Sequence, residues 1–388
     1  MLELPLSPNE RACILDLANA GGKVMLVGGL VRAKLLGKPL QGDVDVEVHN
    51  LPLKEVSRIA EKHGGKLCGK AFGIHVVGNM EIALPRRERK TGRGHTNFEV
   101  EIDPFLGLWE ATARRDFTIN AVTIDVMSGE IYDPHGGKID LAAGILRHTS
   151  SRFVEDPLRV LRAMQFSARL GFAVHPGTIE LCKTLDLTEL SPERFWKEWK
   201  KLLLKGKKIS FGLEFLQKSN AIRFFPELYE INLREIGEAL NKAAGQELEV
   251  MLGILCSQMS DCTKFLKRMT SEKKILKVVP SLVHHVNDIP KAATKPSALR
   301  RLSLKVNLRQ LAAVGQALGI PGSDWLAQNA IEPVKPIVTG KDLLAIGWKP
   351  GPKLGRALKE LFDAQLDGKI KTRREALEWA RRWQHEHI

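Results

Sequence analysis

A glycine pair followed by two acidic residues in a strand-like run constrains the fold of this chain more than any other feature. Gly28 and Gly29 end an apolar stretch, and the alternating run that holds Asp43 and Asp45 begins about fifteen residues later. Side chains two residues apart in a strand share a face, so the two carboxylates project together. The pattern predicts a strand, a glycine turn, a short helix near Leu30 and a second strand bearing the acids.

Two carboxylates on one face repel each other unless a cation lies between them, and oxygen ligands suit Mg²⁺. The glycine backbone and the start of the following helix can approach phosphate groups. A metal beside a phosphate cradle is the arrangement of phosphoryl or nucleotidyl transfer, whereas a solvated strand edge is the ordinary alternative. Two-metal transfer usually needs a third carboxylate. Glu81, which opens the alternating run at residues 81–84, is the candidate.

The 388 residues and 44% hydrophobic content are those of a globular protein with several domains. Up to about residue 139 the pattern is mixed, and strands are expected at residues 44–48, 74–77, 81–84, 98–102 and 118–126. The basic, glycine-punctuated segment 86–95 is expected to be a mobile loop. Helical periodicity dominates after residue 140, at residues 157–170, 176–183, 192–204 and 211–218, and a break is expected near 280–296.

Charge is unevenly distributed along the chain. Lys and Arg outnumber Asp and Glu by only 27 to 26 in residues 1–200, but by 32 to 19 in residues 201–388. A long basic surface indicates a polyanionic partner, and a solvated basic face is the alternative.

No apolar run approaches the ~20 residues of a membrane span. The five scattered cysteines and the lack of a secretory signal favour the cytoplasm.

Two further motifs carry charge next to apolar residues. In the segment 114–120, one of the two arginines is expected to contact a ribose or triphosphate, with Asp116 orienting it or accepting from a ribose hydroxyl. A surface ion pair worth under ~1 kcal/mol is the alternative reading. In the segment 155–162, Asp156 can simply cap a helix that Pro157 begins.

The functional alternative for Asp156 is recognition of a base together with Arg159, three residues along the same helix. A carboxylate accepts from the exocyclic amine of cytosine or adenine, and an arginine donates to the adjacent unprotonated ring nitrogen. Guanine and uracil present a carbonyl and an N–H at those places. Such a pair would therefore select C and A.

The order of these motifs resembles the class II tRNA nucleotidyltransferase and bacterial poly(A) polymerase family. The resemblance covers about residues 24–175 and continues more weakly to the C-terminus. The matching segments are GGLVRAKLLG…DVDVEV, EIALPRRERKTGRGH, RRDFTINAVTIDV, DPHGGKIDL and EDPLRVLRAMQFSARLGF. The family has a polymerase-β-like nucleotidyltransferase head followed by helical neck, body and tail regions that hold tRNA.

The resemblance implies an α+β chain with a head at residues 1–140, a neck with the base-recognition motif at 141–205, a body at 206–290 and an RNA-binding tail at 291–388. It implies metal binding by Asp43 and Asp45 and contact of Gly29, beside Gly28, with the incoming nucleotide. The remaining nucleotide-binding positions that it implies are Arg32, Arg115, Asp156, Arg159 and Arg162.

The expected activity is template-independent addition of CMP, CMP and AMP to the tRNA 3′ end from CTP and ATP, with Mg²⁺ and without a required protein partner. The intact segment 86–95 favours full CCA addition over its alternatives, a poly(A) polymerase or an A-adding enzyme. A catalytically weakened RNA-binding protein is a further alternative. It is suggested by departures from the family pattern at Ala33 and Ala111 and by the lack of a His-Asp pair in residues 255–261; a further departure is Gln165, where the family has an arginine.

Overall fold

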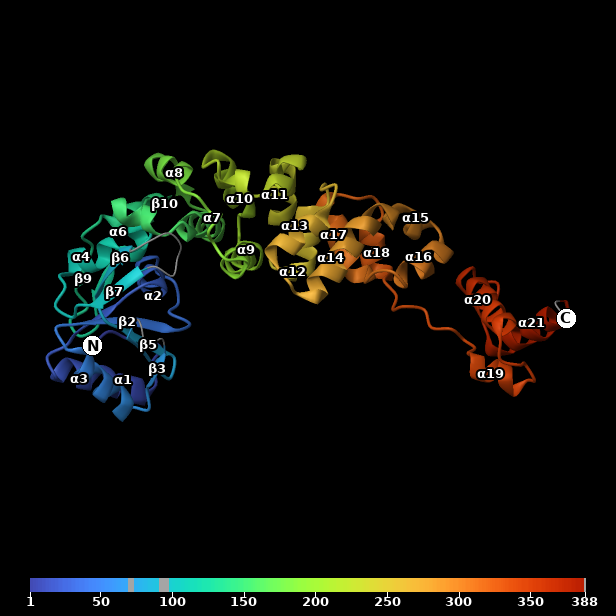
Figure 1. Ribbon diagram of the computed structural model, residues 1–388, viewed down its shortest axis with the longest axis horizontal. Helices are drawn as coiled ribbons and strands as arrows, with labels where there is room; N and C mark the ends of the chain where they lie inside the picture. The colour runs from blue at the N-terminus through green and yellow to red at the C-terminus, as the bar shows by residue number, and fades with distance from the viewer. Residues whose placement is uncertain (69–72, 91–97, 387–388) are drawn as a thin grey trace. The chain divides into compact units, whose positions relative to one another are not determined.

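The computed structural model describes residues 1–68, 73–90 and 98–386. These form two compact units, Met1–Pro226 and Glu227–Ile388. Figure 1 shows the sheet in the N-terminal unit, whereas the C-terminal unit is built of helices. The expected α+β class, a sheet-containing head followed by a helical remainder, is confirmed.

The main sheet of the N-terminal unit has, within the described residues, seven strands in the order β3-β4-β5-β2-β1-β8-β9. The strand β2 pairs in parallel with β5 and antiparallel with β1, so it lies at the centre of the sheet. The strands are β1 (Lys23–Leu26), β2 (Val44–His49), β3 (Lys66–Cys68), β4 (Ile74–Val77), β5 (Met80–Ala83), β8 (Thr123–Asp125) and β9 (Ile131–Tyr132).

The alternation in β2 decides which face of the sheet is apolar. Val44, Val46 and Val48 belong to the buried core together with side chains of α1 (Pro8–Asn19) and α3 (Leu53–Lys62). Because successive strand residues point to opposite faces, Asp45 and Glu47 point away from this core. The helices α1 and α3 lie side by side below the sheet in Figure 1, which leaves the other face for polar chemistry.

That other face is approached by α2 (Gly29–Leu35), which contacts β2 and α5 (Thr118–Ala121). Further along the chain follow α4 (Leu108–Ala113), α6 (Gly137–Ala143), a 3₁₀ turn (Ser151–Glu155) and α7 (Leu158–Leu170). The short strands β10 (Ile145–Leu146) and β11 (Ala173–Val174) pair in parallel beside α7. The unit is completed by α8 (Pro176–Lys183), α9 (Pro192–Lys205), α10 (Ile209–Lys218) and a 3₁₀ turn (Ala221–Phe224).

Two expected elements differ from those observed. The strand expected at 118–126 begins instead with the helical turn α5, because Thr118 and Asn120 are buried and bind Asp140 and Asp116 with their side chains. The segment expected as a loop at 86–95 forms the strand β6 (Arg86–Lys90), paired antiparallel with β7 (Phe98–Ile102). Composition carries no information about a cross-strand partner. Residues 91–97 of that segment lie outside the described part.

The C-terminal unit is helical from α11 onward. Its helices are α11 (Leu233–Lys242), α12 (Leu248–Cys256), α13 (Cys262–Met269), α14 (Lys273–His285), α15 (Ile289–Thr294), α16 (Pro296–Ser303), α17 (Leu308–Leu318), α18 (Ser323–Asn329), α19 (Gly340–Ala345), α20 (Pro352–Leu366) and α21 (Arg373–Glu386), with 3₁₀ turns at Pro226–Glu230 and Val286–Asp288. The break expected near 280–296 is occupied by α14 and α15, since Pro280 lies inside a helix and Pro290 near a helix start. The irregular stretch is residues 330–339.

The last three helices pack around their own apolar cluster. Trp348 and Trp383 lie within it with ring centroids 5.6 Å apart, and Trp383 donates to Glu360. In the part of the chain that the structure describes, none of the helices has the length and apolar character needed to cross a membrane.

Candidate functional site

A cavity of about 510 Å³ opens on the polar face of the sheet in the N-terminal unit. A space of this size falls in the usual range for small-molecule sites. Five separate segments contribute to its wall: the glycine turn with α2, strand β2, the start of β6, the residues from the end of α4 into α5, and α7 with the residues before it. The lining residues include Gly28, Gly29, Arg32, Asp45, Arg86, Arg114, Arg115, Asp116, Asn120, Asp156, Arg159, Arg162 and Phe166.

The glycine turn lies directly against the acidic strand. Gly28 has φ +75° and ψ −131°, a conformation that L side chains rarely adopt, and a Cβ built on it would lie 3.1 Å from Oδ2 of Asp45. The amide of Val27 donates to the carbonyl of Asp45 at 2.9 Å. The turn therefore needs glycine for two reasons, backbone conformation and space for the carboxylate.

Three carboxylates interact at this end of the sheet. Asp45 lines the cavity and lies opposite Glu81 in the parallel register of β2 and β5. Asp43 precedes β2 by one residue, and both Asp43 and Glu81 are exposed. Burial and then the charges of Glu81 and Asp43 raise the pKa of Asp45, although Arg115 and Arg32 oppose this. Mutual repulsion of this kind is relieved by a cation.

The donor set at Asp45 fits a hard divalent cation. All the donors are carboxylate oxygens, which Mg²⁺ and similar ions prefer, and Mg²⁺ is commonly held by one or two carboxylates plus phosphate oxygens of the substrate. Within residues 1–68, 73–90 and 98–386, no group of three or more His, Cys, Asp or Glu side chains is arranged to hold a metal ion.

Asp116 is the centre of the hydrogen bonds on the opposite wall. It accepts from Nε of Arg162 at 2.7 Å, from the side chain of Asn120 at 2.7 Å and from the amide of Phe117 at 2.8 Å. Burial works against the charged carboxylate, but Arg162 and these hydrogen bonds hold the pKa of Asp116 below its ordinary value. Asn120 also accepts from Arg32. A single buried anion thus orients two arginines, one of them through Asn120.

The ring of Phe166 contacts these two arginines and a third, Arg169. The guanidinium groups of Arg32, Arg162 and Arg169 lie 5.2, 5.3 and 5.4 Å from its centroid, within the range of cation–π contact. Burial lowers the pKa of Arg32 to about 10 despite the nearby charge of Asp116. Cations gathered in a partly desolvated wall are suited to a polyanionic group such as a triphosphate.

The two residues expected to read a base line the cavity, but each has a protein partner. Asp156 accepts from the amide of Leu158 at 3.1 Å and from Arg194 of α9 with both oxygens at 3.2 Å. Arg159 donates to the carbonyls of Arg152 at 2.7 Å and Arg114 at 2.5 Å. The Asp156 carboxylate therefore binds the first amide of α7, whose N-cap residue is Pro157. Base recognition by this pair would require an exchange of partners.

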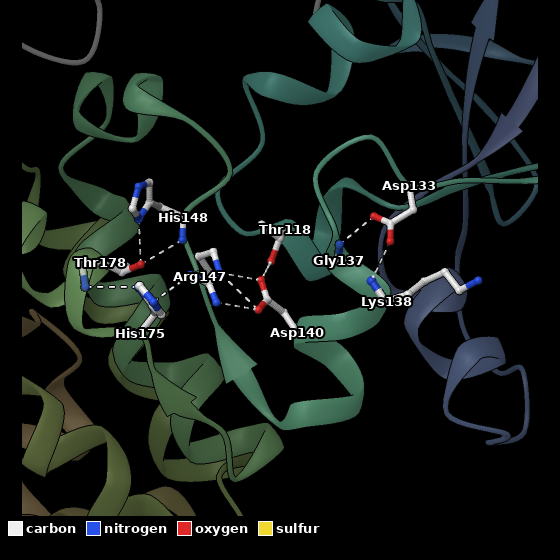
Figure 2. A network of polar contacts seen from close by, with 10 residues as sticks. Thr118, Asp133, Gly137, Lys138, Asp140, Arg147, His148, His175 and Thr178 are labelled. Atoms are coloured by element: carbon white, nitrogen blue, oxygen red, sulfur yellow. Dashed lines mark hydrogen bonds and ion pairs between the residues drawn. The ribbon is translucent and has the colours of Figure 1, made fainter.

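Figure 2 shows the polar network that supports the start of α5 at Thr118. Asp140 accepts from the hydroxyl of Thr118 at 2.7 Å and from Arg147, whose Nε lies 3.0 Å away. Arg147 also contacts Nε2 of His175 at 2.7 Å. Since α5 begins at Thr118, this network fixes the helical turn that presents Asn120 to the cavity.

Several residues at the site were not predicted from the sequence, among them Glu47, Asn120, Phe166 and Arg194. Glu47 had a readable signal, because it continues the two-residue spacing of Asp43 and Asp45 along one face of β2. Asn120 lay in a segment already recognised, but its role depends on Arg32, 88 residues away. Phe166 and Arg194 gave no local signal, since their partners come from other elements.

Two family comparisons match separate parts of the chain. Residues 24–147 match the poly A polymerase head domain, and residues 245–380 match tRNA nucleotidyltransferase domain 2. A "Multifunctional CCA protein" of Xanthomonas campestris pv. campestris (strain B100) is 43% identical over 216 residues, which are 53% of this chain and 51% of that protein. One of Haemophilus ducreyi is 41% identical over 220 residues, 54% and 52% of the two chains. The chain spans about half the length of the curated relatives it matches.

Solved structures match over nearly the whole chain. The CCA-adding enzyme of Bacillus stearothermophilus, solved in complex with CTP, aligns with a TM-score of 0.74 and 25% identity over 98% of this chain and 99% of that one. The Thermotoga maritima CCA-adding enzyme, complexed with tRNA, aligns with a TM-score of 0.69 and 21% identity over 97% and 95%. The second likeness concerns the fold alone.

Proposed function

Because this chain belongs to the class II tRNA nucleotidyltransferase and bacterial poly(A) polymerase family, we propose that it adds CMP, CMP and AMP in turn to the 3′ end of tRNA. CTP and ATP would be the substrates. In each step the terminal 3′ oxygen attacks the α-phosphorus of the nucleotide. A new P–O bond forms, the bond to pyrophosphate breaks, pyrophosphate leaves and the hydroxyl proton is released to solvent.

One observation carries this proposal: a single cavity of about 510 Å³ is lined by Asp45, the glycine turn, Arg115 and Asp156. An acidic residue, a backbone that can approach phosphates, a cationic wall and a group able to read a base are what nucleotidyl transfer without a template requires. A catalytically weakened protein would not need all four to converge.

The acidic end of the cavity is the place for the metal. Asp43 and Asp45 would hold a divalent ion, for which we propose Mg²⁺, and Glu81 would be the third carboxylate beside them. When bound, the ion makes the 3′ hydroxyl more acidic and neutralises charge on the triphosphate. Gly28 and Gly29 leave room beside Asp45 for phosphate oxygens. Arg32 and Arg115 would clamp the triphosphate, with Asp116 and Arg162 fixing the wall behind them.

At the other end of the cavity, Asp156 would accept from the exocyclic amine of C or A, and Arg159 would donate to the ring nitrogen. Arg194 now occupies both oxygens of Asp156. The incoming base therefore competes with an intramolecular partner, which disfavours bases that cannot return the same hydrogen bonds. UTP and GTP present a carbonyl and an N–H at these positions and would be rejected.

The basic second half of the chain would hold the acceptor stem and elbow of tRNA through phosphate and shape contacts. It carries 32 Lys and Arg against 19 Asp and Glu in residues 201–388.

The five cysteines are free thiols, as is usual in a reducing compartment, and we place the reaction in the cytoplasm.

The experiment supplies purified protein with tRNA that ends before CCA, and with CTP, ATP or both. We expect two added residues with CTP alone and three with both nucleotides. Addition of A only to tRNA ending in CC would indicate an A-adding enzyme, and long A tracts would indicate a poly(A) polymerase. Tight tRNA binding without any incorporation would contradict an enzymatic role.

Asp43→Ala and Asp45→Ala should each lower the rate of incorporation by roughly 10³-fold or more, since a metal ion supplies several kcal/mol.

A further inference from the structure

Glu47 is a buried carboxylate on the same face of β2 as Asp45, beneath the cavity wall. Its side chain is 1% exposed. Unlike Asp45 it does not line the cavity, so it cannot reach a bound ligand directly. A buried charge is costly unless it is paired. The partners of Glu47 therefore indicate what the residue does.

Two consecutive arginines supply that pairing. Oε2 of Glu47 accepts from Nη2 of Arg114 at 3.0 Å and from Nη2 of Arg115 at 3.5 Å. Its other oxygen, Oε1, lies 3.2 Å from Nε2 of His49. Both arginines line the cavity above, so one buried carboxylate holds two cavity cations from behind.

The two arginines transmit this anchoring to both ends of the cavity. The positive charge of Arg115 opposes the rise in the pKa of Asp45. The carbonyl of Arg114 accepts from Nη2 of Arg159 at 2.5 Å, which reaches the base-reading helix α7. Residues 114–115 therefore connect Glu47 with groups at both ends of the cavity.

We propose that Glu47 is a positioning residue for the incoming nucleotide: its carboxylate holds the side chains of Arg114 and Arg115 so that Arg115 faces the triphosphate. This inference rests on the proposed nucleotidyl transfer at the same cavity. The residue acts through Arg115, so its loss weakens nucleotide binding and leaves the acidic groups at Asp43 and Asp45 in place.

The alternative to a positioning role is that Glu47 and its arginines form a buried ion cluster that only stabilises the fold. Glu47→Gln distinguishes the two because it keeps the shape and one acceptor oxygen while removing the charge. We expect the KM for both CTP and ATP to rise about tenfold, the effect of losing a charge-assisted hydrogen bond, with kcat within about threefold of the original. Equilibrium binding of CTP, measured without tRNA, should weaken by the same factor of about ten.

The matched control is Glu227→Gln in the C-terminal unit. Glu227 is also a buried carboxylate paired with an arginine, Arg268, and it is not among the residues that line the cavity. This variant should lose thermal stability without any change in the KM for nucleotides. If Glu47→Gln behaves like this control, losing stability only, the positioning role is wrong.

A double-mutant cycle provides the sharper test. If Glu47 acts through Arg115, the combination Glu47→Gln with Arg115→Ala should bind CTP no more weakly than Arg115→Ala alone. Additive losses would contradict the inference. Should Glu47→Gln fail to fold, Glu47→Asp retains the charge and enters the same cycle with the same two outcomes. If the original protein binds CTP but extends no tRNA, the proposed function fails while the CTP-binding cycle still decides the role of Glu47.

Discussion

Asp45 combines two demands that conflict in the absence of a ligand. Its carboxylate must be ionised to bind a metal, yet burial and the charges of Glu81 and Asp43 raise its pKa. A carboxyl whose pKa is raised by folding stabilises the folded state below its unfolded pKa, and this contribution is lost as the pH rises through the folded value. At neutral pH and without metal, the ionised group therefore destabilises the fold.

Asp45→Asn should accordingly raise the melting temperature at pH 7 in the presence of a chelator, and the gain should vanish as the pH falls toward 4. Asp186→Asn is the control of opposite sign, because hydrogen bonds from Thr188 lower the pKa of Asp186. Thermal unfolding across pH 4–8 measures both. An Asp45→Asn protein that is less stable than the original at pH 7 without metal would contradict this account of the acidic cluster.

Asp156 provides a second prediction at the residue scale, because it both accepts from the first amide of α7 and is the proposed reader of a base. Asp156→Asn should reduce discrimination against UTP and GTP by about 10- to 100-fold, the worth of one well-formed pair of base contacts. The measurement is kcat/KM for each of the four nucleotides.

Asp261 supplies the control for capping. It accepts from the amides of Thr263 and Lys264 at the start of α13 and does not line the cavity. Asp261→Asn should change stability by under about 2 kcal/mol, as caps do, and leave nucleotide choice intact. If Asp156→Asn discriminates against UTP and GTP as well as the original protein does, Asp156 has only a structural role at the start of α7.

At the scale of elements, the turn between β1 and α2 matters most to the site, because Gly28 in this turn lies against Asp45. Gly28→Ala should cost about 1–2 kcal/mol of stability for a residue held at positive φ. It should also slow incorporation by up to about 100-fold, since a shift of ~1 Å at a reacting group can have that effect. The reason is that the new Cβ would lie 3.1 Å from Oδ2 of Asp45.

Gly37→Ala is the control that separates the effect of backbone strain from the effect of steric contact with Asp45. Gly37 also has a positive φ, +63°, but a Cβ there meets no atom within 4 Å. Gly37→Ala should therefore lose similar stability and keep its activity. Equal activity losses in the two variants would show that backbone strain alone, without the contact at Asp45, explains the effect of Gly28→Ala.

Elements that local pattern specifies could be predicted from the sequence, and elements defined by distant partners could not. The alternation in β2 and the helical periods of α7 and α8 are local, and the structure places these elements within a residue of expectation. The helical turn α5 depends on Asp140, which lies 22 residues from Thr118. β6 depends on its pairing with β7.

The same distinction holds for the candidate site. The residue types could be read from the motifs, but the partner of Asp156 is Arg194, 38 residues away, and that of Asp116 is Arg162, 46 residues away. Only the folded chain brings these pairs together, so sequence alone could name the charges and not their connections.

At the scale of the whole molecule, the proposed function is divided between chemistry in the N-terminal unit and tRNA binding by positive charge in the second half of the chain. Arg381 and Arg382 are exposed on α21, near the end of the described chain. Replacing both with Ala should raise the KM for tRNA and leave that for CTP unchanged. The slope of log Kd against log salt should fall by about 1 for each phosphate group that the protein no longer neutralises.

Arg58 is the control for this charge removal. It is exposed on α3 of the N-terminal unit and pairs with Glu55. Arg58→Ala should leave the salt dependence of tRNA binding unchanged. A salt slope that is identical in all three proteins would mean that α21 does not contact phosphate.

The central claim is that Asp43 and Asp45, beside the glycine turn, bind a divalent ion against a nucleoside triphosphate. A crystal structure with CTP and Mn²⁺, in which the anomalous signal locates the metal, tests it most directly. We predict a metal peak within coordination distance of carboxylate oxygens of both residues, with phosphates beside Gly28 and Gly29 and the base next to Asp156. A nucleotide bound elsewhere, or a metal that neither aspartate touches, would contradict the account.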